Sequence, residues 1–135
     1  MQLEPEIFKW LYDNKIISDD ATAAISPEGK VELDEETSAT VQNGTIFIRL
    51  IRILKRYMQI SSPAPIQTPP NLFNMKDDNT IGTRLYNWNI IVECLTKFHY
   101  PIDHDIKNLI VKGDEETALE VLKEVYNLIM DLVKV

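Results

Sequence analysis

The sequence predicts an all-α fold, a compact helical bundle that forms one domain over residues 1–135. Apolar residues recur at offsets of three and four in several segments, which is the spacing of one helix face. Capping and helix-breaking residues separate these segments. With 44% hydrophobic residues, the chain has enough apolar surface for one core. We therefore expect a single helical domain.

The first helix is predicted to begin at Pro5, because the first turn of a helix tolerates a residue without an N–H group. Asp13-Asn14 slows or ends it. The residues expected to face inward are Ile7, Phe8, Trp10, Leu11 and Ile16. Residues 18–42 are acidic and rich in small side chains, so we expect a long acidic loop with short helical turns. Within it, Ser26-Pro27-Glu28-Gly29 is typical of a turn.

The next segment follows Asn43-Gly44 and begins at Thr45. Its β-branched residues would suit a strand, but the apolar residues at 46, 47, 50, 51, 53, 54 and 57 have helical spacing, so we predict a buried helix. Residues 61–83 are predicted to form a proline-rich crossover, since 61–70 holds four of the seven prolines. We expect Leu72, Phe73 and Met75 to dock this crossover on the core.

Two helices are predicted between Leu85 and Gly113. The first ends before Pro101, and its apolar face consists of Trp88, Ile91, Val92, Leu95 and Phe98. The second is short. Asp103 is expected to cap its first turn, Ile106, Leu109 and Ile110 form its apolar side, and Lys112-Gly113 is a typical end.

The last helix is predicted to begin after Asp114, with Glu115 and Glu116 in the first turn, where they suit the helix dipole. Its apolar face consists of Leu119, Leu122, Tyr126, Ile129, Leu132 and Val133. No cap or breaker follows. We expect this helix to continue in a longer chain, as a coiled coil that pairs two copies.

The net charge of −7 repels nucleic acid and acidic lipid at long range. No apolar run approaches the roughly 20 residues of a membrane-spanning helix, and the first residues lack the pattern of a secretory signal. We therefore expect a cytoplasmic protein with no nucleic-acid or membrane partner. The single cysteine, Cys94, lies beside an apolar face and is interpreted as a packing residue.

Basic residues concentrate in one place. Arg49, Arg52 and Arg56 share one face of the predicted buried helix, with Lys55 nearby. Two interpretations stay open. The arginines bind carboxylates of an acidic protein partner, or they form a solvated face paired with acidic loop residues, namely Glu32, Asp34, Glu35 and Glu36.

A second candidate set is Lys97, Lys107 and Lys112, around the short helix. Lysines are the ordinary residues of a helix surface, so solvation alone accounts for them more readily than a contact with a partner does.

No motif for catalysis or cofactor binding is present. The four glycines are isolated and cannot form a phosphate-binding loop. His99 and His104 lie near Asp103 and Asp105, but a structural zinc site needs four ligands, and the chain has one cysteine and two histidines. We predict no catalytic residue, no cofactor and no metal.

Several short motifs give the chain a resemblance to a known family. They are Phe8-Lys9-Trp10-Leu11, Asn43-Gly44-Thr45-Ile46-Phe47, Leu85-Tyr86-Asn87-Trp88-Asn89, Phe98-His99-Tyr100-Pro101, Asp105-Ile106-Lys107-Asn108-Leu109-Ile110 and Ala118-Leu119-Glu120-Val121-Leu122. In this order they resemble the calponin-homology-like domains of sperm flagellar and ciliary proteins. Residues 85–133 are the most specific part of the resemblance.

The resemblance implies a non-catalytic interaction domain of a ciliary, flagellar or centriolar protein, located in the cytoskeleton. It implies docking onto axonemal or centriolar proteins, or direct microtubule binding, in which the arginines contact tubulin. The acidic net charge favours docking over direct binding. The alternative hypothesis is a small helical scaffold subunit of a larger enzyme or nucleic-acid complex.

Overall fold

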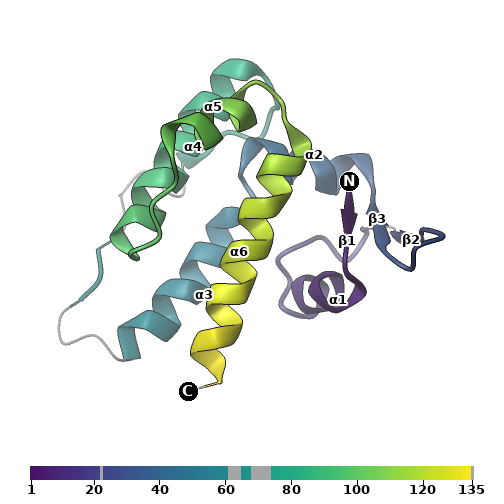
Figure 1. Ribbon diagram of the computed structural model, residues 1–135, viewed down its shortest axis with the longest axis horizontal. Coiled ribbons are helices and arrows are strands. Elements are labelled where there is room, and N and C mark those ends of the chain that lie inside the picture. The colour runs from purple at the N-terminus through teal and green to yellow at the C-terminus, as the bar shows by residue number, and fades with distance from the viewer. Residues whose placement is uncertain (22, 61–64, 68–73, 135) are drawn as a thin grey trace.

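The structure is a computed structural model that describes residues 1–21, 23–60, 65–67 and 74–134. Within these residues the fold is mostly helical, with six α-helices and one three-stranded sheet (Figure 1). The helices are α1 (Pro5–Asp13), α2 (Glu35–Asn43), α3 (Phe47–Ile60), α4 (Ile81–Lys97), α5 (His104–Val111) and α6 (Glu115–Val133). The strands are β1 (Gln2–Leu3), β2 (Ala23–Ile25) and β3 (Val31–Leu33).

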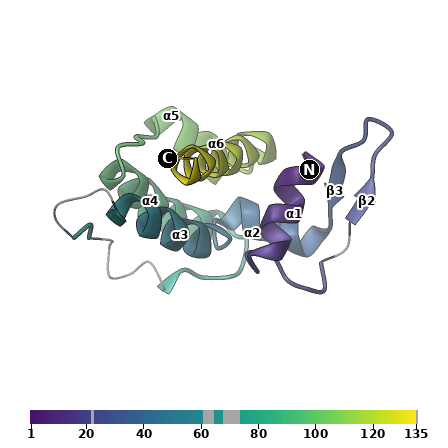
Figure 2. The same cartoon turned by 90° about the horizontal axis from the view of Figure 1, so that it is seen from below.

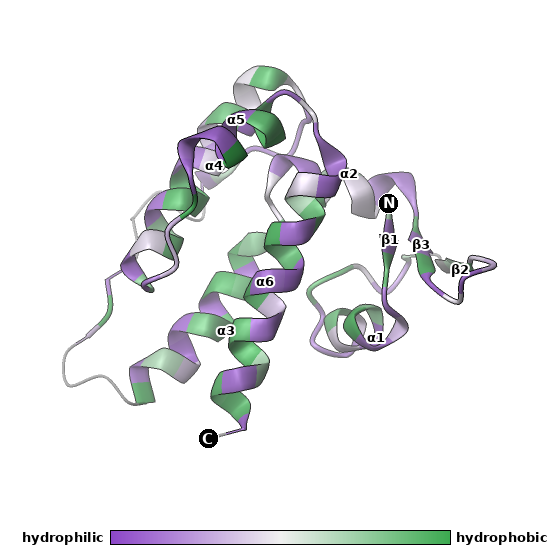
Figure 3. Ribbon diagram, in the orientation of Figure 1, coloured by the Kyte–Doolittle hydropathy of each residue, from purple (hydrophilic) through white to green (hydrophobic). Residues whose placement is uncertain are grey.

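Helix α6 organises the helical body, because it packs against α2, α3 and α5. Helix α4 packs against α2, α3 and α5. Figure 2 shows α3, α4 and α5 at one end of the molecule, α1 with the sheet at the other, and α2 between them. Hydrophobic residues recur along α3 and α6 in Figure 3, between hydrophilic ones. The fully buried side chains at the centre include Phe47, Leu50, Ile51, Trp88, Ile91, Leu95 and Leu119. The predicted apolar faces of α3, α4 and α6 therefore build one core.

The small sheet corrects the all-α prediction. Its strand order is β1-β3-β2, and both pairings are antiparallel. The predicted turn at 26–29 is confirmed, since the Ser26 N–H donates to the Lys30 carbonyl at 2.7 Å and Gly29 has φ 80°. Strands of two or three residues are too short to show an alternating pattern, and β1 forms only by pairing with a segment far along the chain.

The predicted acidic loop at 18–42 is wrong in its second half, where α2 forms. The side chain of Asp34 accepts a hydrogen bond from the Thr37 N–H at 2.8 Å, and Gly44, with φ 87°, ends the helix. Little of α2 is apolar, so hydrophobic periodicity does not reveal it. The signal that would have found it is the cap, Asp34 followed by Glu35 and Glu36.

The crossover ends at residue 80 rather than 83, because α4 begins at Ile81. Thr80 caps this helix by accepting a hydrogen bond from the Thr83 N–H at 3.2 Å. Met75 packs against the core as expected. Leu72 and Phe73, and most of the proline cluster, lie outside the described residues.

Helix α5 forms where predicted, but two details differ. The side chain of Asp103 makes no capping hydrogen bond, and Leu109 is 46% exposed, so only Ile110 of the predicted apolar side is buried. By contrast, Asp114 caps α6 as predicted, accepting from the Thr117 N–H at 3.1 Å. Val133 is 49% exposed because the end of α6 reaches the edge of the helical body (Figure 1).

Candidate functional site

The two Asn-containing motifs, at 43–44 and 87–88, contact each other. The Asn87 side chain donates to the Asn43 carbonyl at 2.8 Å, and the Trp88 indole N–H donates to the Gln42 carbonyl at 2.7 Å. Asn87 and Trp88 are fully buried. Gly44 lies so close to α4 that an added Cβ would come within 2.3 Å of Ile91 Cδ1. This junction, residues 42–44 with 87–88, therefore holds α4 against the turn between α2 and α3.

The same asparagines also fix the chain that leads into α4. Asn87 accepts from the Lys76 N–H at 3.1 Å and donates to the Lys76 carbonyl at 2.8 Å. Asn43 donates to the carbonyls of Asp77 and Asp78 at 3.0 and 3.1 Å. These hydrogen bonds satisfy backbone groups of an irregular segment. The motif residues thus have structural roles and are not available to a partner.

Arg84 is a buried cation that the sequence patterns do not reveal. Only 9% of it is exposed, and its guanidinium donates to the Val111 carbonyl at 2.8 Å and the Asn79 carbonyl at 2.6 Å. Val111 is the last residue of α5, so the positive charge lies at the negative end of that helix dipole. Arg84 therefore joins α4 to α5 and is not a binding residue.

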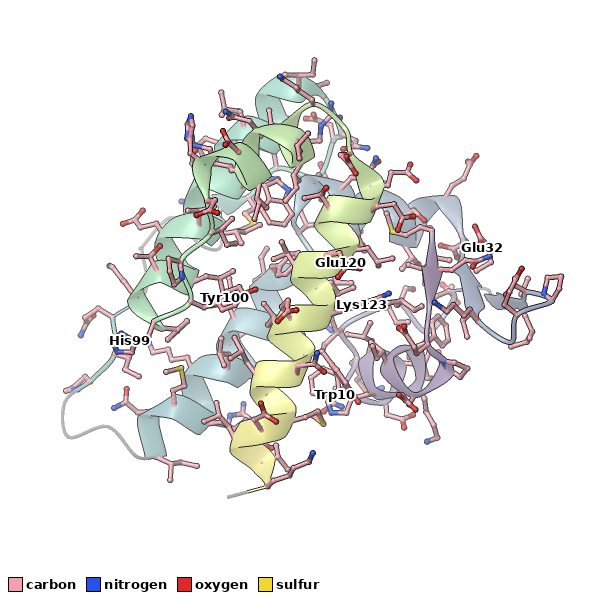
Figure 4. All side chains as sticks on the ribbon, in the orientation of Figure 1. Trp10, Glu32, His99, Tyr100, Glu120 and Lys123 are labelled. Carbon is pink, nitrogen blue, oxygen red and sulfur yellow. The ribbon has the colours of Figure 1, made fainter. Side chains whose placement is uncertain are left out.

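The arginines of α3 line an open hollow of about 360 Å³. Arg52 and Arg56 follow Arg49 by three and seven residues, so the three arginines share one face of the helix. The other lining residues are Trp10, Asn14, Ile53 and Tyr57. Helix α1 thus supplies Trp10, which also contacts the Tyr126 ring of α6 edge-on, with centroids 5.4 Å apart. Figure 4 shows Trp10 beside α6. We call these residues the arginine hollow.

The end of α1 is tied to the arginine hollow. The Arg49 guanidinium donates to the Lys15 carbonyl, and Lys15 has the left-handed φ of 58° that ends the helix. Since this bond uses a neutral acceptor, it does not compensate the charge of Arg49. The sequence placed the three arginines together, but not Trp10 or Asn14 beside them.

The pairing of Arg49 or Arg56 with the acidic loop is wrong. Within the described residues, neither arginine forms an ion pair with a carboxylate. Glu32 instead accepts from the amino group of Met1 at 3.0 Å, and this hydrogen bond lowers the pKa of Glu32. Lys55 lies on the same helix, partly buried, and does not line the arginine hollow.

The three lysines of the second candidate set do not form one patch. Lys107 donates to Asn89 at 2.9 Å, and Arg84 at the start of α4 reaches the end of α5, so the two helices run antiparallel. Lys97 is the last residue of α4, and Lys112 directly follows the last residue of α5. These two residues therefore lie at opposite ends of the helix pair.

Burial raises the pKa of the Cys94 thiol to about 11, so this thiol stays protonated near neutral pH. Among the residues that the structure describes, no group of three or more His, Cys, Asp or Glu side chains is arranged to hold a metal. In the same residues, no helix combines the length and apolar character needed to cross a membrane.

Comparison with protein-family models, curated proteins and solved structures found no match for this chain.

Proposed function

We propose that this chain is a non-catalytic protein-interaction domain that holds an acidic segment of a cytoskeletal partner in the arginine hollow. One observation carries the proposal: three arginines converge on an open hollow, and no described carboxylate pairs with Arg49 or Arg56. An acidic side chain of a partner would supply a countercharge to Arg49 and Arg56.

The chemistry of the hollow suits carboxylates in a flexible peptide. A guanidinium donates two parallel hydrogen bonds to one carboxylate, and it stays charged at every physiological pH. The rings of Trp10 and Tyr57 provide apolar walls for the methylene groups of a glutamate. Since the hollow is open, the contact is screened by salt, with a Debye length of about 8 Å at physiological ionic strength.

The resemblance to calponin-homology-like domains supports the cytoskeletal setting. It favours a ciliary, flagellar or centriolar assembly, in which the acidic tails of tubulin or an acidic docking protein would occupy the arginine hollow. The net charge of −7 opposes long-range attraction to an acidic lattice. Docking to a protein with a short acidic segment therefore agrees better with the whole chain than binding to the bare lattice.

The test is co-sedimentation with microtubules, and with microtubule-associated assemblies, across a salt series. The R49E/R52E/R56E variant changes the charge by six units, and K97E/K107E/K112E changes it equally at the other candidate set. We expect the arginine variant to lose binding, the lysine variant to retain it, and both to keep the wild-type circular dichroism spectrum.

Equal loss in both variants would show that net charge, not the arginine hollow, controls binding. No pelleting at low salt with a folded protein would remove the cytoskeletal role and leave the scaffold-subunit hypothesis.

A further inference from the structure

A second hollow lies between α5, α6 and the loop that follows α4. Its volume is about 400 Å³, and its floor is apolar, formed by Tyr100, Ile106, Leu109 and Val121. Leu109 is exposed by 46% although it follows the apolar spacing of α5. We call this surface the α5–α6 groove. An exposed leucine within an apolar floor is typical of a protein–protein contact surface.

One edge of the groove is acidic. Glu116, Glu120 and Glu124 are four residues apart, so they form a single row along α6. All three are exposed, and in the described residues none is in an ion pair. Lys123 of the same helix pairs instead with Glu4 at 3.4 Å, on the side of the sheet.

Tyr100 belongs to the loop that follows α4 and contributes its ring to the floor of the groove. It extends toward α6 in Figure 4. Burial and then the charge of Glu124 raise the pKa of its hydroxyl, so the hydroxyl stays protonated at neutral pH. It has no hydrogen-bond partner among the described residues, which leaves it able to bond with a partner molecule.

We propose that the α5–α6 groove docks a cationic amphipathic helix of a partner protein. The apolar face of that helix would cover Leu109 and Ile106, and its lysines or arginines would pair with the glutamate row. Carboxylates four residues apart are about 6 Å apart along the helix axis. A partner helix with basic residues at intervals of three or four residues matches this spacing, as in other helix-in-groove contacts.

The arginines of a second copy of this chain have a similar spacing, but shape opposes that occupant. Arg49, Arg52 and Arg56 line a hollow, and the α5–α6 groove is also a hollow. Two concave surfaces cannot bury each other. A separate basic helix, convex by nature, fits the groove. This inference does not depend on the proposed role of the arginine hollow, and the two surfaces together would let one domain join an acidic partner to a basic one.

The test uses a fluorescent amphipathic peptide of about 14 residues, roughly four helical turns, with leucines on one face and lysines along its edge. The control peptide has the same composition in scrambled order. Fluorescence anisotropy is measured with the wild-type protein, L109S, and E116Q/E120Q/E124Q. The matched variant E28Q/E36Q/E93Q makes the same charge change at exposed glutamates elsewhere.

We expect saturable binding of the amphipathic peptide and at least tenfold weaker binding of the scrambled one. The E116Q/E120Q/E124Q variant should bind about tenfold more weakly than wild type, since three exposed ion pairs are lost. L109S should also bind more weakly, and the matched variant should bind as the wild type does. Because all the substituted residues are exposed, the variants are expected to fold.

Three results would overturn the inference. One is no saturable binding. Another is equal binding of the two peptides, because charge alone would then explain the affinity. The third is self-association of the wild-type protein in analytical ultracentrifugation that both E116Q/E120Q/E124Q and R49E/R52E/R56E abolish, since the occupant would then be a second copy.

Discussion

The buried junction and the two hollows use polar residues in opposite ways. At the junction, Asn43 and Asn87 are buried, and their side chains bond to backbone groups. At the arginine hollow and the α5–α6 groove, charged side chains are exposed, and Arg56 and Glu120 have no ionic partner in the described residues. The most distinctive sequence motifs thus stabilise the fold, whereas charged residues that recur at helical spacing on α3 and α6 line the two exposed hollows.

The largest effect on stability is expected from Gly44→Ala. An added Cβ would lie 2.3 Å from Ile91 Cδ1 in the closed core, and φ is 87°. Left-handed strain and overpacking together should lower the free energy of unfolding by about 2–4 kcal/mol. Urea denaturation measures the loss.

Gly29→Ala is the matched control, because Gly29 has φ 80° but no atom within 4 Å of an added Cβ. It should lose only about 1 kcal/mol, the cost of the left-handed backbone. If the two variants lost the same stability, close packing at the junction would contribute nothing beyond the cost of the left-handed backbone.

A somewhat smaller effect is expected from Asn87→Ala. This change leaves the N–H and carbonyl of Lys76 and the carbonyl of Asn43 without their partner. The loss should be about 2 kcal/mol, and amide hydrogen exchange should accelerate at Lys76. Asn89→Ala, on the same helix, removes only an exposed bond to Lys107 and should change stability by less than about 0.5 kcal/mol. A large loss of stability in Asn89→Ala would contradict the expectation that buried asparagines stabilise this fold more than exposed ones do.

The smallest effect is expected from charge reversal on the surfaces. R49E/R52E/R56E should shift the free energy of unfolding by less than about 1 kcal/mol, because these arginines are exposed and the contacts of such residues contribute little.

The reactivity of Cys94 provides a second measurement of how often the core opens. This residue is buried and protonated at pH 8, so a disulfide reagent reacts only when the core opens. The reaction rate should stay within about fivefold of the wild-type rate in R49E/R52E/R56E and increase more than that in Gly44→Ala.

The pKa of the Cys94 thiol also determines how this residue makes the stability of the fold depend on pH. Its pKa rises on folding from 9.0 to about 11, so the unfolded chain releases the proton first as the pH increases. Cys94 therefore favours unfolding from about pH 9 upward and has no effect on stability at neutral pH. Denaturation of the wild type and Cys94→Ala at pH 7 and pH 10 checks this. An equal change with pH in both proteins would show that other groups control it.

Much of the helical framework could be predicted from local signals, and most of both hollows could not. Pro5 and Asp114 start helices as predicted, and the arginines were expected on one face of α3. The α5–α6 groove was missed because Leu109 has core-like spacing, and only its 46% exposure distinguishes it. Arg84 was missed because nothing in its sequence surroundings distinguishes a buried arginine from an exposed one.

By itself, the sequence determined where α1, α3, α5 and α6 form and where α4 ends, since capping and apolar spacing act over a few residues. Only the tertiary structure decided the pairing of β1 with β3, the burial of Arg84 against α5, and the approach of Trp10 to the α3 arginines. Each of these joins segments far apart in the chain. Their formation depends on how the helices pack together, and no local pattern of residues encodes that arrangement.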